Sequence, residues 1–112
     1  MDKFGLLPSG NNIPFEVHLE HLDQQRKEIM LDMRAFAKSL GSSVIEEVRP
    51  HRVVYAKTLT FRTFLDVEPA GDHLLVEVRA GRAEPPMRFE LRTQQDLEEV
   101  KKHAAQAYEK IH

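Results

Sequence analysis

Arginines are concentrated in the middle of this 112-residue sequence, where they could bind anions. A guanidinium group forms forked hydrogen bonds to phosphate or carboxylate and also stacks on aromatic rings. Residues 48–65 contain neither Asp nor Glu. The candidate site for an anionic ligand or nucleic acid consists of the basic residues of this stretch, which are Arg49, His51, Arg52, Lys57 and Arg62.

The same arginines also have a purely structural interpretation. Residues 49–92 contain eight Lys and Arg against six Asp and Glu, so the excess is only two positive charges. Asp66, Glu68, Glu77 and Glu90 lie in the neighbouring expected strands, where cross-strand ion pairs would occupy the guanidinium groups. The sequence leaves both interpretations open.

Three larger side chains are candidates for a binding surface on the sheet. Alternation along the expected strands places Phe64 and Leu75 on the outer face, and Tyr55 joins them if its strand has the matching parity. An exposed aromatic and aliphatic patch suits a protein partner, stacked bases or a second copy of the chain in a homodimer. The alternative is that Met1–Ile13 folds over this patch.

Motifs for catalysis and metal binding are missing from the sequence. The chain has no Cys, its serines lack a G-x-S-x-G context, and its five glycines are isolated. His18 and His21 are three residues apart, but the sequence places no third ligand near them, so we expect a solvated helix start. We therefore assign no catalytic residue, metal or cofactor. A small enzyme acting on an anionic metabolite is the alternative to a non-catalytic binding module.

The elements that must position these residues begin and end with helices. Apolar residues recur every three or four positions between about Phe15 and Leu40, interrupted once at Arg26, which predicts one long helix. The second helix follows Thr93, a good N-cap residue, with Asp96 at the capping-box position.

The segment between the helices has strand chemistry. Alternating residues near 60–67, 74–78 and 87–91, together with the β-rich run at 53–56, predict about four strands, and Val44–Val48 could add another. Short links indicate an antiparallel meander with one dry face. The expected class is α+β, with both helices on one face of the sheet and the other face open.

The expected core follows from these periodicities. Residues 1–13 are expected to form a loose leader and residues 14–112 a single domain. The side chains expected to pack together are Leu22, Ile29, Met33, Phe36, Phe61, Leu65, Val76, Phe89, Leu97, Val100 and Tyr108.

Composition and hydropathy predict a soluble cytoplasmic protein without a membrane partner. No apolar run approaches the roughly 20 residues that a membrane span needs. The segment Met1–Asn12 also lacks the basic start and long apolar stretch of a signal peptide. With 41% hydrophobic and 30% charged residues, the chain has the composition of a globular domain.

Three segments resemble an uncharacterised prokaryotic domain of unknown function, some of whose members are labelled predicted transport proteins. They are Ser39–Val48, Phe61–Pro69 and Thr93–Val100, the last continued by Gln106–Glu109. The resemblance implies an α-β4-α arrangement. It brings no established activity and no active site, and the Gly81–Pro86 loop is shorter here than in many relatives.

Overall fold

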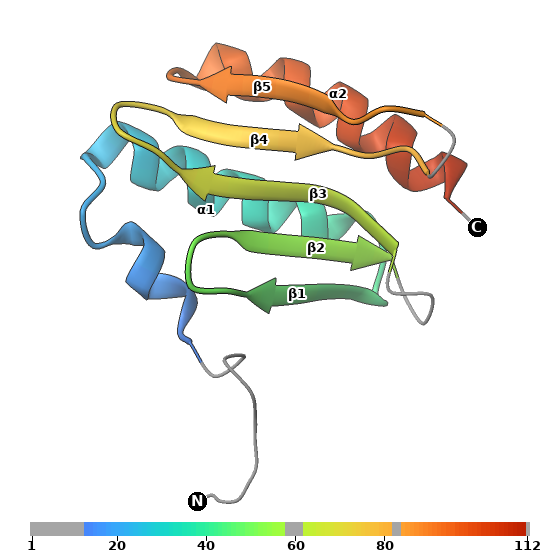
Figure 1. Ribbon diagram of the computed structural model, residues 1–112, viewed down its shortest axis with the longest axis horizontal. Coiled ribbons are helices and arrows are strands. Elements are labelled where there is room, and N and C mark those ends of the chain that lie inside the picture. The colour runs from blue at the N-terminus through green and yellow to red at the C-terminus, as the bar shows by residue number, and fades with distance from the viewer. Residues whose placement is uncertain (1–12, 58–61, 82–83, 112) are drawn as a thin grey trace, which may run out of the picture.

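The chain has an α+β fold with two α-helices and a five-stranded antiparallel meander (Figure 1). The computed structural model describes residues 13–57, 62–81 and 84–111. Its elements are the 3₁₀ helix η2 (Phe15–Leu19), α1 (Gln24–Ser39), β1 (Val44–Val48), β2 (Val53–Lys57), β3 (Arg62–Pro69), β4 (Leu74–Val78), β5 (Met87–Leu91) and α2 (Gln94–Lys110).

The expected long N-terminal helix is wrong in its first part. The chain instead forms η2, turns at residues 20–23 and restarts as α1. The restart has a local cause, because the carboxylate of Asp23 accepts a hydrogen bond of 2.9 Å from the backbone N–H of Arg26 and caps the new helix. Arg26, which interrupted the apolar stripe, donates to the carbonyls of Ala70 and Gly71 in the β3–β4 turn.

The sheet is the predicted meander, with five strands rather than about four. Its strand order is β1-β2-β3-β4-β5, and every neighbouring pair is antiparallel. The additional strand is β1, whose residues Val44–Val48 pair in full register with residues 53–57. Two adjacent acids did not prevent strand formation, because Glu46 and Glu47 point to opposite faces.

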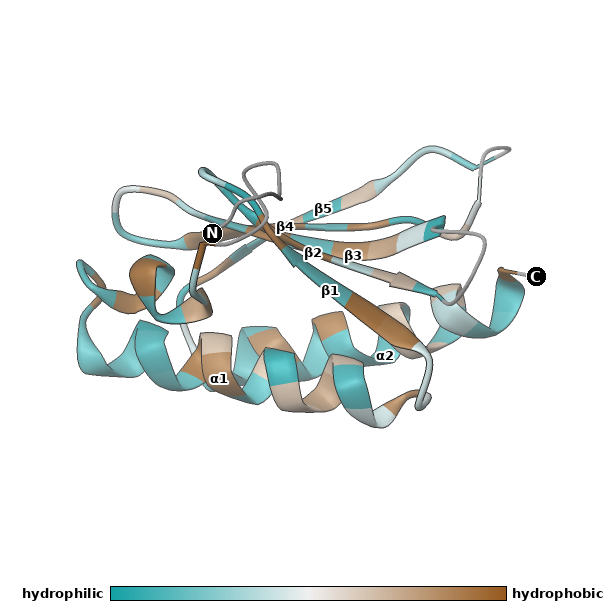
Figure 2. Ribbon diagram, turned by 90° about the horizontal axis from the view of Figure 1, so that it is seen from below, coloured by the Kyte–Doolittle hydropathy of each residue, from teal (hydrophilic) through white to brown (hydrophobic). Residues whose placement is uncertain are grey.

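The core lies between the sheet and the helices. Figure 2 shows α1 and α2 on the same side of the sheet. Seven of the expected core residues are buried, while Phe36, Phe89 and Tyr108 are partly buried against the same cluster. Ile13, expected in the leader, packs against this cluster as well. Residues 1–12 and the expected core residue Phe61 lie outside the described residues. The seven buried residues are Leu22, Ile29, Met33, Leu65, Val76, Leu97 and Val100.

A register shift between β2 and β3 overturns the predicted alternation of β3. Tyr55 pairs with Leu65 but Ala56 pairs with Thr63, so Phe64 has no residue opposite it in β2. Phe64 consequently turns into the core and is fully buried, with its ring centroid 5.3 Å from that of Tyr108 in α2. Thr63, expected on the dry face, pairs instead with Ala56.

Candidate functional site: the open face of the sheet

The side of the sheet away from α1 and α2 is the candidate functional surface, and we call it the open face. Residues directly opposite each other in an antiparallel pair point to the same side of a sheet. Glu46 of β1 binds Arg34 of α1, so Glu47 and the residues in register with it face away from the helices. The registers assign to the open face Ile45, Glu47, Val54, Ala56, Thr63, Asp66, Glu68, Leu75, Glu77, Arg88 and Glu90.

Ion pairs engage two of the candidate arginines at one end of the open face. Arg49 Nη2 lies 2.7 Å from Glu47 Oε1. Arg52 Nη2 lies 2.9 Å from Glu68 Oε1, and its Nη1 lies 3.7 Å from Asp66 Oδ1. The alternative to anion binding was that carboxylates of the sheet occupy these guanidinium groups, and these ion pairs are of that kind.

A second set of ion pairs is centred on Glu77 of β4. Its Oε1 accepts a hydrogen bond of 2.6 Å from Arg79, and its Oε2 accepts one of 2.7 Å from Arg88 in β5. Glu77 is buried although it lies on the open face, because the two arginines cover it. A further guanidinium, that of Arg92, lies 3.2 Å from a carboxylate oxygen of Glu90.

The five candidate anion-binding residues do not form one site. Arg49, His51 and Arg52 lie in the β1–β2 turn, whereas Lys57 and Arg62 pair at the other end of β2 and β3. The distance from residue 52 to residue 57 along the strand is about 17 Å at about 3.4 Å per residue. Lys57 also points to the helix side, where its Nζ donates bonds of 2.7 Å to two carbonyls at the end of α2.

Two of the three stacking candidates are core residues: the expected place of Phe64 on the surface is wrong, and the condition set for Tyr55 is not met. Phe64 is buried because of the register shift, and Tyr55 has the opposite parity to the one required. The Tyr55 hydroxyl donates a 2.8 Å hydrogen bond to Glu46 Oε2 beneath the sheet. Burial, reinforced by the charge of Glu46, raises the pKa of Tyr55 far above its usual value. Leu75 alone lies half-buried on the open face.

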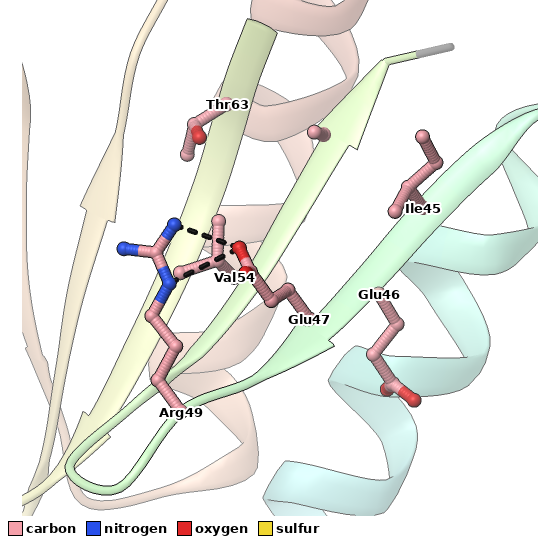
Figure 3. A pocket seen from close by; sticks show the side chains of 7 residues that line it. Ile45, Glu46, Glu47, Arg49, Val54 and Thr63 are labelled. Carbon is pink, nitrogen blue, oxygen red and sulfur yellow. Dashed lines mark hydrogen bonds and ion pairs between the residues drawn. The ribbon is translucent and has the colours of Figure 1, made fainter. Parts of the chain in front are cut away.

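A hollow of about 310 Å³ opens on this face over β1, β2 and β3. Its floor is formed by small and apolar side chains, and the Glu47–Arg49 ion pair extends over it (Figure 3). The sequence did not reveal this hollow, because only the register shift sets Thr63 opposite Ala56 and so juxtaposes two small side chains. The lining residues are Ile45, Glu46, Glu47, Arg49, Val54, Ala56 and Thr63.

The carboxylate of Asp66, beside this hollow, is buried with few partners. It is directly opposite Val54 on one side and Glu77 on the other, and only 5% of its surface is exposed. Among the described residues its carboxylate accepts no hydrogen bond, and the one cation within 4 Å is Arg52 at 3.7 Å. Burial, followed by the charge of Glu77, therefore raises the pKa of Asp66.

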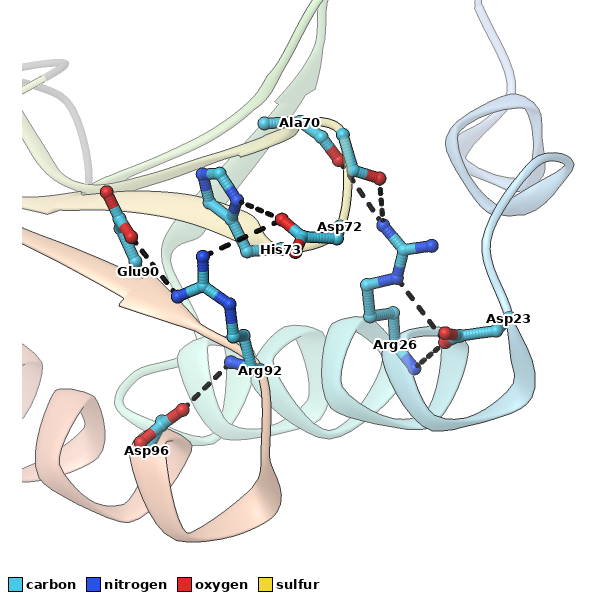
Figure 4. Close-up of polar contacts among 9 residues, drawn as sticks. Asp23, Arg26, Ala70, Asp72, His73, Glu90, Arg92 and Asp96 are labelled. Carbon is cyan, nitrogen blue, oxygen red and sulfur yellow. Dashed lines mark hydrogen bonds and ion pairs between the residues drawn. The ribbon is translucent and has the colours of Figure 1, made fainter.

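The polar contacts at the β3–β4 turn are structural rather than a ligand site. Arg26 joins the start of α1 to this turn, and Arg92 lies 3.6 Å from Asp72 in the same turn (Figure 4). A hydrogen bond from His73, followed by the charge of Arg92, lowers the pKa of Asp72. The polar side chains of this cluster bond to groups of the same chain.

His18 lies inside the structure and not at a solvated helix start as expected. It is 9% exposed, and its Nε2 donates a 2.7 Å hydrogen bond to the carbonyl of Arg49. This bond attaches η2 to the β1–β2 turn. Within residues 13–57, 62–81 and 84–111, no three His, Asp or Glu side chains are placed to hold a metal ion.

No helix in the described part of the chain is both long enough and apolar enough to cross a membrane. Comparisons with protein-family models, with curated proteins and with solved structures each give no match to this chain.

Proposed function

We propose that the protein is a non-catalytic binding module that holds a partner protein against the open face. The observation that carries this proposal is the hollow on the open face, with its apolar floor of Val54 and Ala56 and its ion-paired rim. Protein interfaces combine an apolar centre with a polar rim in this way. The hollow would receive one apolar side chain of the partner, and the rim would contact its polar groups.

The charges of the open face favour a protein over a polyanion. Its arginines alternate with carboxylates at 2.6–3.2 Å, so the surface presents both signs of charge in close proximity. A phosphate-rich ligand would have to displace these carboxylates and would leave them without partners. A protein surface can instead supply complementary charges of both signs.

Filling the hollow tests the proposal. Small aliphatic and aromatic fragments of side-chain size serve as probes, and amide chemical shifts of the labelled protein report where they bind. We expect saturable shifts at Ile45, Val54 and Ala56. The variant Ala56→Leu fills the hollow and should abolish them, whereas Ala35→Leu on the exposed side of α1 adds the same atoms elsewhere and should retain them.

Two results would count against this function. Saturable shifts that map outside the hollow, or that survive Ala56→Leu, would show that the hollow is not the binding site. Turnover of a metabolite, lost on substitution of one residue that lines the hollow, would replace the binding module with the alternative of a small enzyme. A thermal-shift screen of metabolites followed by turnover assays provides that comparison.

An anionic ligand is the second candidate, and it rests on two exposed basic residues. Among the described residues, neither His51 nor Arg62 has a carboxylate partner. They lie at opposite ends of β2, so each would contact a different part of an extended ligand. Titration with oligonucleotides, described below, tests this candidate separately from the hollow.

A further inference from the structure

The edge strand β5 has features that the proposed function does not use. It pairs with β4 on one side and forms the edge of the sheet on the other (Figure 1). Within the described part of the chain, the backbone of residues 87–91 forms hydrogen bonds with β4 only. Met87, at the start of the strand, is 43% exposed. An edge with unpaired N–H and C=O groups is a template for another strand.

The sequence of β5 is complementary to itself in the antiparallel direction. If Phe89 lies opposite Phe89 of a second copy, Arg88 lies opposite Glu90 and Met87 lies opposite Leu91. Opposed residues share a face, with Cβ atoms about 4.5–5.5 Å apart. The three apolar pairs then lie on the helix side, and the two pairs of opposite charge lie on the open face.

The ion pairs within one copy can be continued by ion pairs between β5 of that copy and β5 of the second copy. Arg88 binds Glu77 through its Nε, and 70% of its side chain remains exposed. Its two terminal NH₂ groups, which donate to no described residue, are available for Glu90 of the second copy. Glu90 is itself 3.2 Å from Arg92, so the charges along the junction would alternate in sign.

The opposite edge of the sheet lacks this complementarity. Antiparallel pairing of β1 with itself, centred on Glu46, would put two Glu46 carboxylates against each other and Ile45 against Glu47. Like charges directly opposite each other destabilise a strand pair. Glu46 is also bound already by Arg34 and Tyr55 of its own chain. Pairing centred on the middle residue of the strand is therefore complementary for β5 and not for β1.

We propose that the chain forms a twofold-symmetric homodimer in which β5 pairs with β5 of a second copy. The two sheets become one continuous antiparallel sheet, and the twofold axis runs perpendicular to it, midway between the two Phe89 residues. The helices of both copies then lie on one side and both open faces on the other. The interface leaves the hollow uncovered, so this dimer does not depend on the proposed function.

Exchange of the two charges provides a sharp test. In Glu90→Arg alone, arginines oppose each other across the junction, and in Arg88→Glu alone, glutamates do. Each variant should weaken the dimer about tenfold or more, because two favourable pairs become repulsive. An equimolar mixture of the two variants restores opposite charges at both positions, so the dimer should return. Analytical ultracentrifugation over a dilution series measures these changes.

The matched control is Glu47→Arg on β1, which changes the charge by the same amount on the other edge and should leave the dimer intact. Circular dichroism establishes that each variant is folded. Arg88→Glu places a second glutamate beside Glu77 and could prevent folding. In that case the proposal is tested by comparing the dimer strength of Glu90→Arg with that of Glu47→Arg. Parent protein that sediments as a monomer at its highest concentration overturns the proposal. So does a dimer that Glu90→Arg leaves unchanged, or a mixture of folded variants that stays monomeric.

Discussion

At the scale of single residues, Gly41 is the position where the segment after α1 comes closest to Tyr108 of α2 without room for a side chain. Its φ is not in the left-handed range, so the backbone itself does not require glycine. A Cβ at this position would instead overlap the hydroxyl of Tyr108 in α2. The Tyr108 ring cannot withdraw easily, because it packs edge-on against Phe64 and lies 4.2 Å from Lys57 Nζ.

The variant Gly41→Ala should therefore be less stable than the parent by about 1–3 kcal/mol, the usual cost of overpacking. Urea denaturation measures the difference. Removing the obstructing hydroxyl in the double variant Gly41→Ala, Tyr108→Phe should recover a large part of the loss. Equal losses in the single and double variants would show that the hydroxyl is not the cause.

Asp66 gives a second prediction, which concerns pH. Its pKa is raised in the folded chain by burial and by Glu77, so the fold favours the protonated carboxyl. The stability from this proton is fully present below the ordinary pKa of 3.8 and is lost as pH rises through the raised value. Asp66→Asn, which is neutral at every pH, should therefore be more stable than the parent at neutral pH.

Denaturation of parent and variant across a pH series measures the sign of the stability difference between them. The advantage of Asp66→Asn should shrink as pH falls and disappear below about pH 3.8. Glu68→Gln is the control, because it removes a more exposed carboxylate that hydrogen-bonds Arg52, and it should bring no gain at neutral pH. A variant at Asp66 that loses stability at neutral pH would show that Arg52 fully compensates the charge.

The residue scale is also where the sequence was least informative about the site. Strand periodicity predicted the face of Leu75 correctly, but not that of Phe64. One unpaired residue in β3 reverses which side of the sheet the preceding residues of that strand face. Tyr55 had no assigned parity until its cross-strand partners were known. The pairing of Arg52 with Glu68 was anticipated as an alternative, but composition alone could not choose it.

At the scale of elements, α2 is the helix whose start was predicted most completely. Thr93 Oγ1 accepts a 3.1 Å bond from Asp96 N, and Asp96 Oδ2 accepts one of 3.1 Å from Thr93 N. Thr93→Ala removes the first bond and should cost about 1 kcal/mol. Thr93→Ser keeps the hydroxyl and should lose much less. Thermal or urea unfolding of both variants measures the contrast, and equal losses would show that packing of the Thr93 methyl group matters instead.

The elements that the sequence mispredicted share a physical cause. The apolar stripe of residues 15–40 continues through the break between η2 and α1, because both pieces bury their apolar sides on the same core. Periodicity therefore cannot detect the break, and only the capping contact of Asp23 marks it. The strands were predicted from alternation, whereas their register depends on contacts between segments distant in sequence.

At the scale of the whole molecule, the balance of charge predicts weak affinity for nucleic acids. The net charge is −2, and the arginines of the open face are paired with carboxylates. We expect fluorescence-anisotropy titrations with single- and double-stranded DNA and RNA to stay flat even at low salt. Binding that falls steeply with salt, with Arg62→Ala reducing the slope by about one, would instead establish the anion-binding candidate.

The meander has a kinetic consequence. Because each strand pairs with its neighbour in sequence, the sheet can grow one hairpin at a time, and every step closes a short loop. The two helices come from opposite ends of the chain, so their contact closes the longest loop and is entropically the most demanding. A partly folded chain would then have a formed sheet with α2 undocked, and its exposed Leu97 and Val100 would be the surface most prone to aggregation during folding.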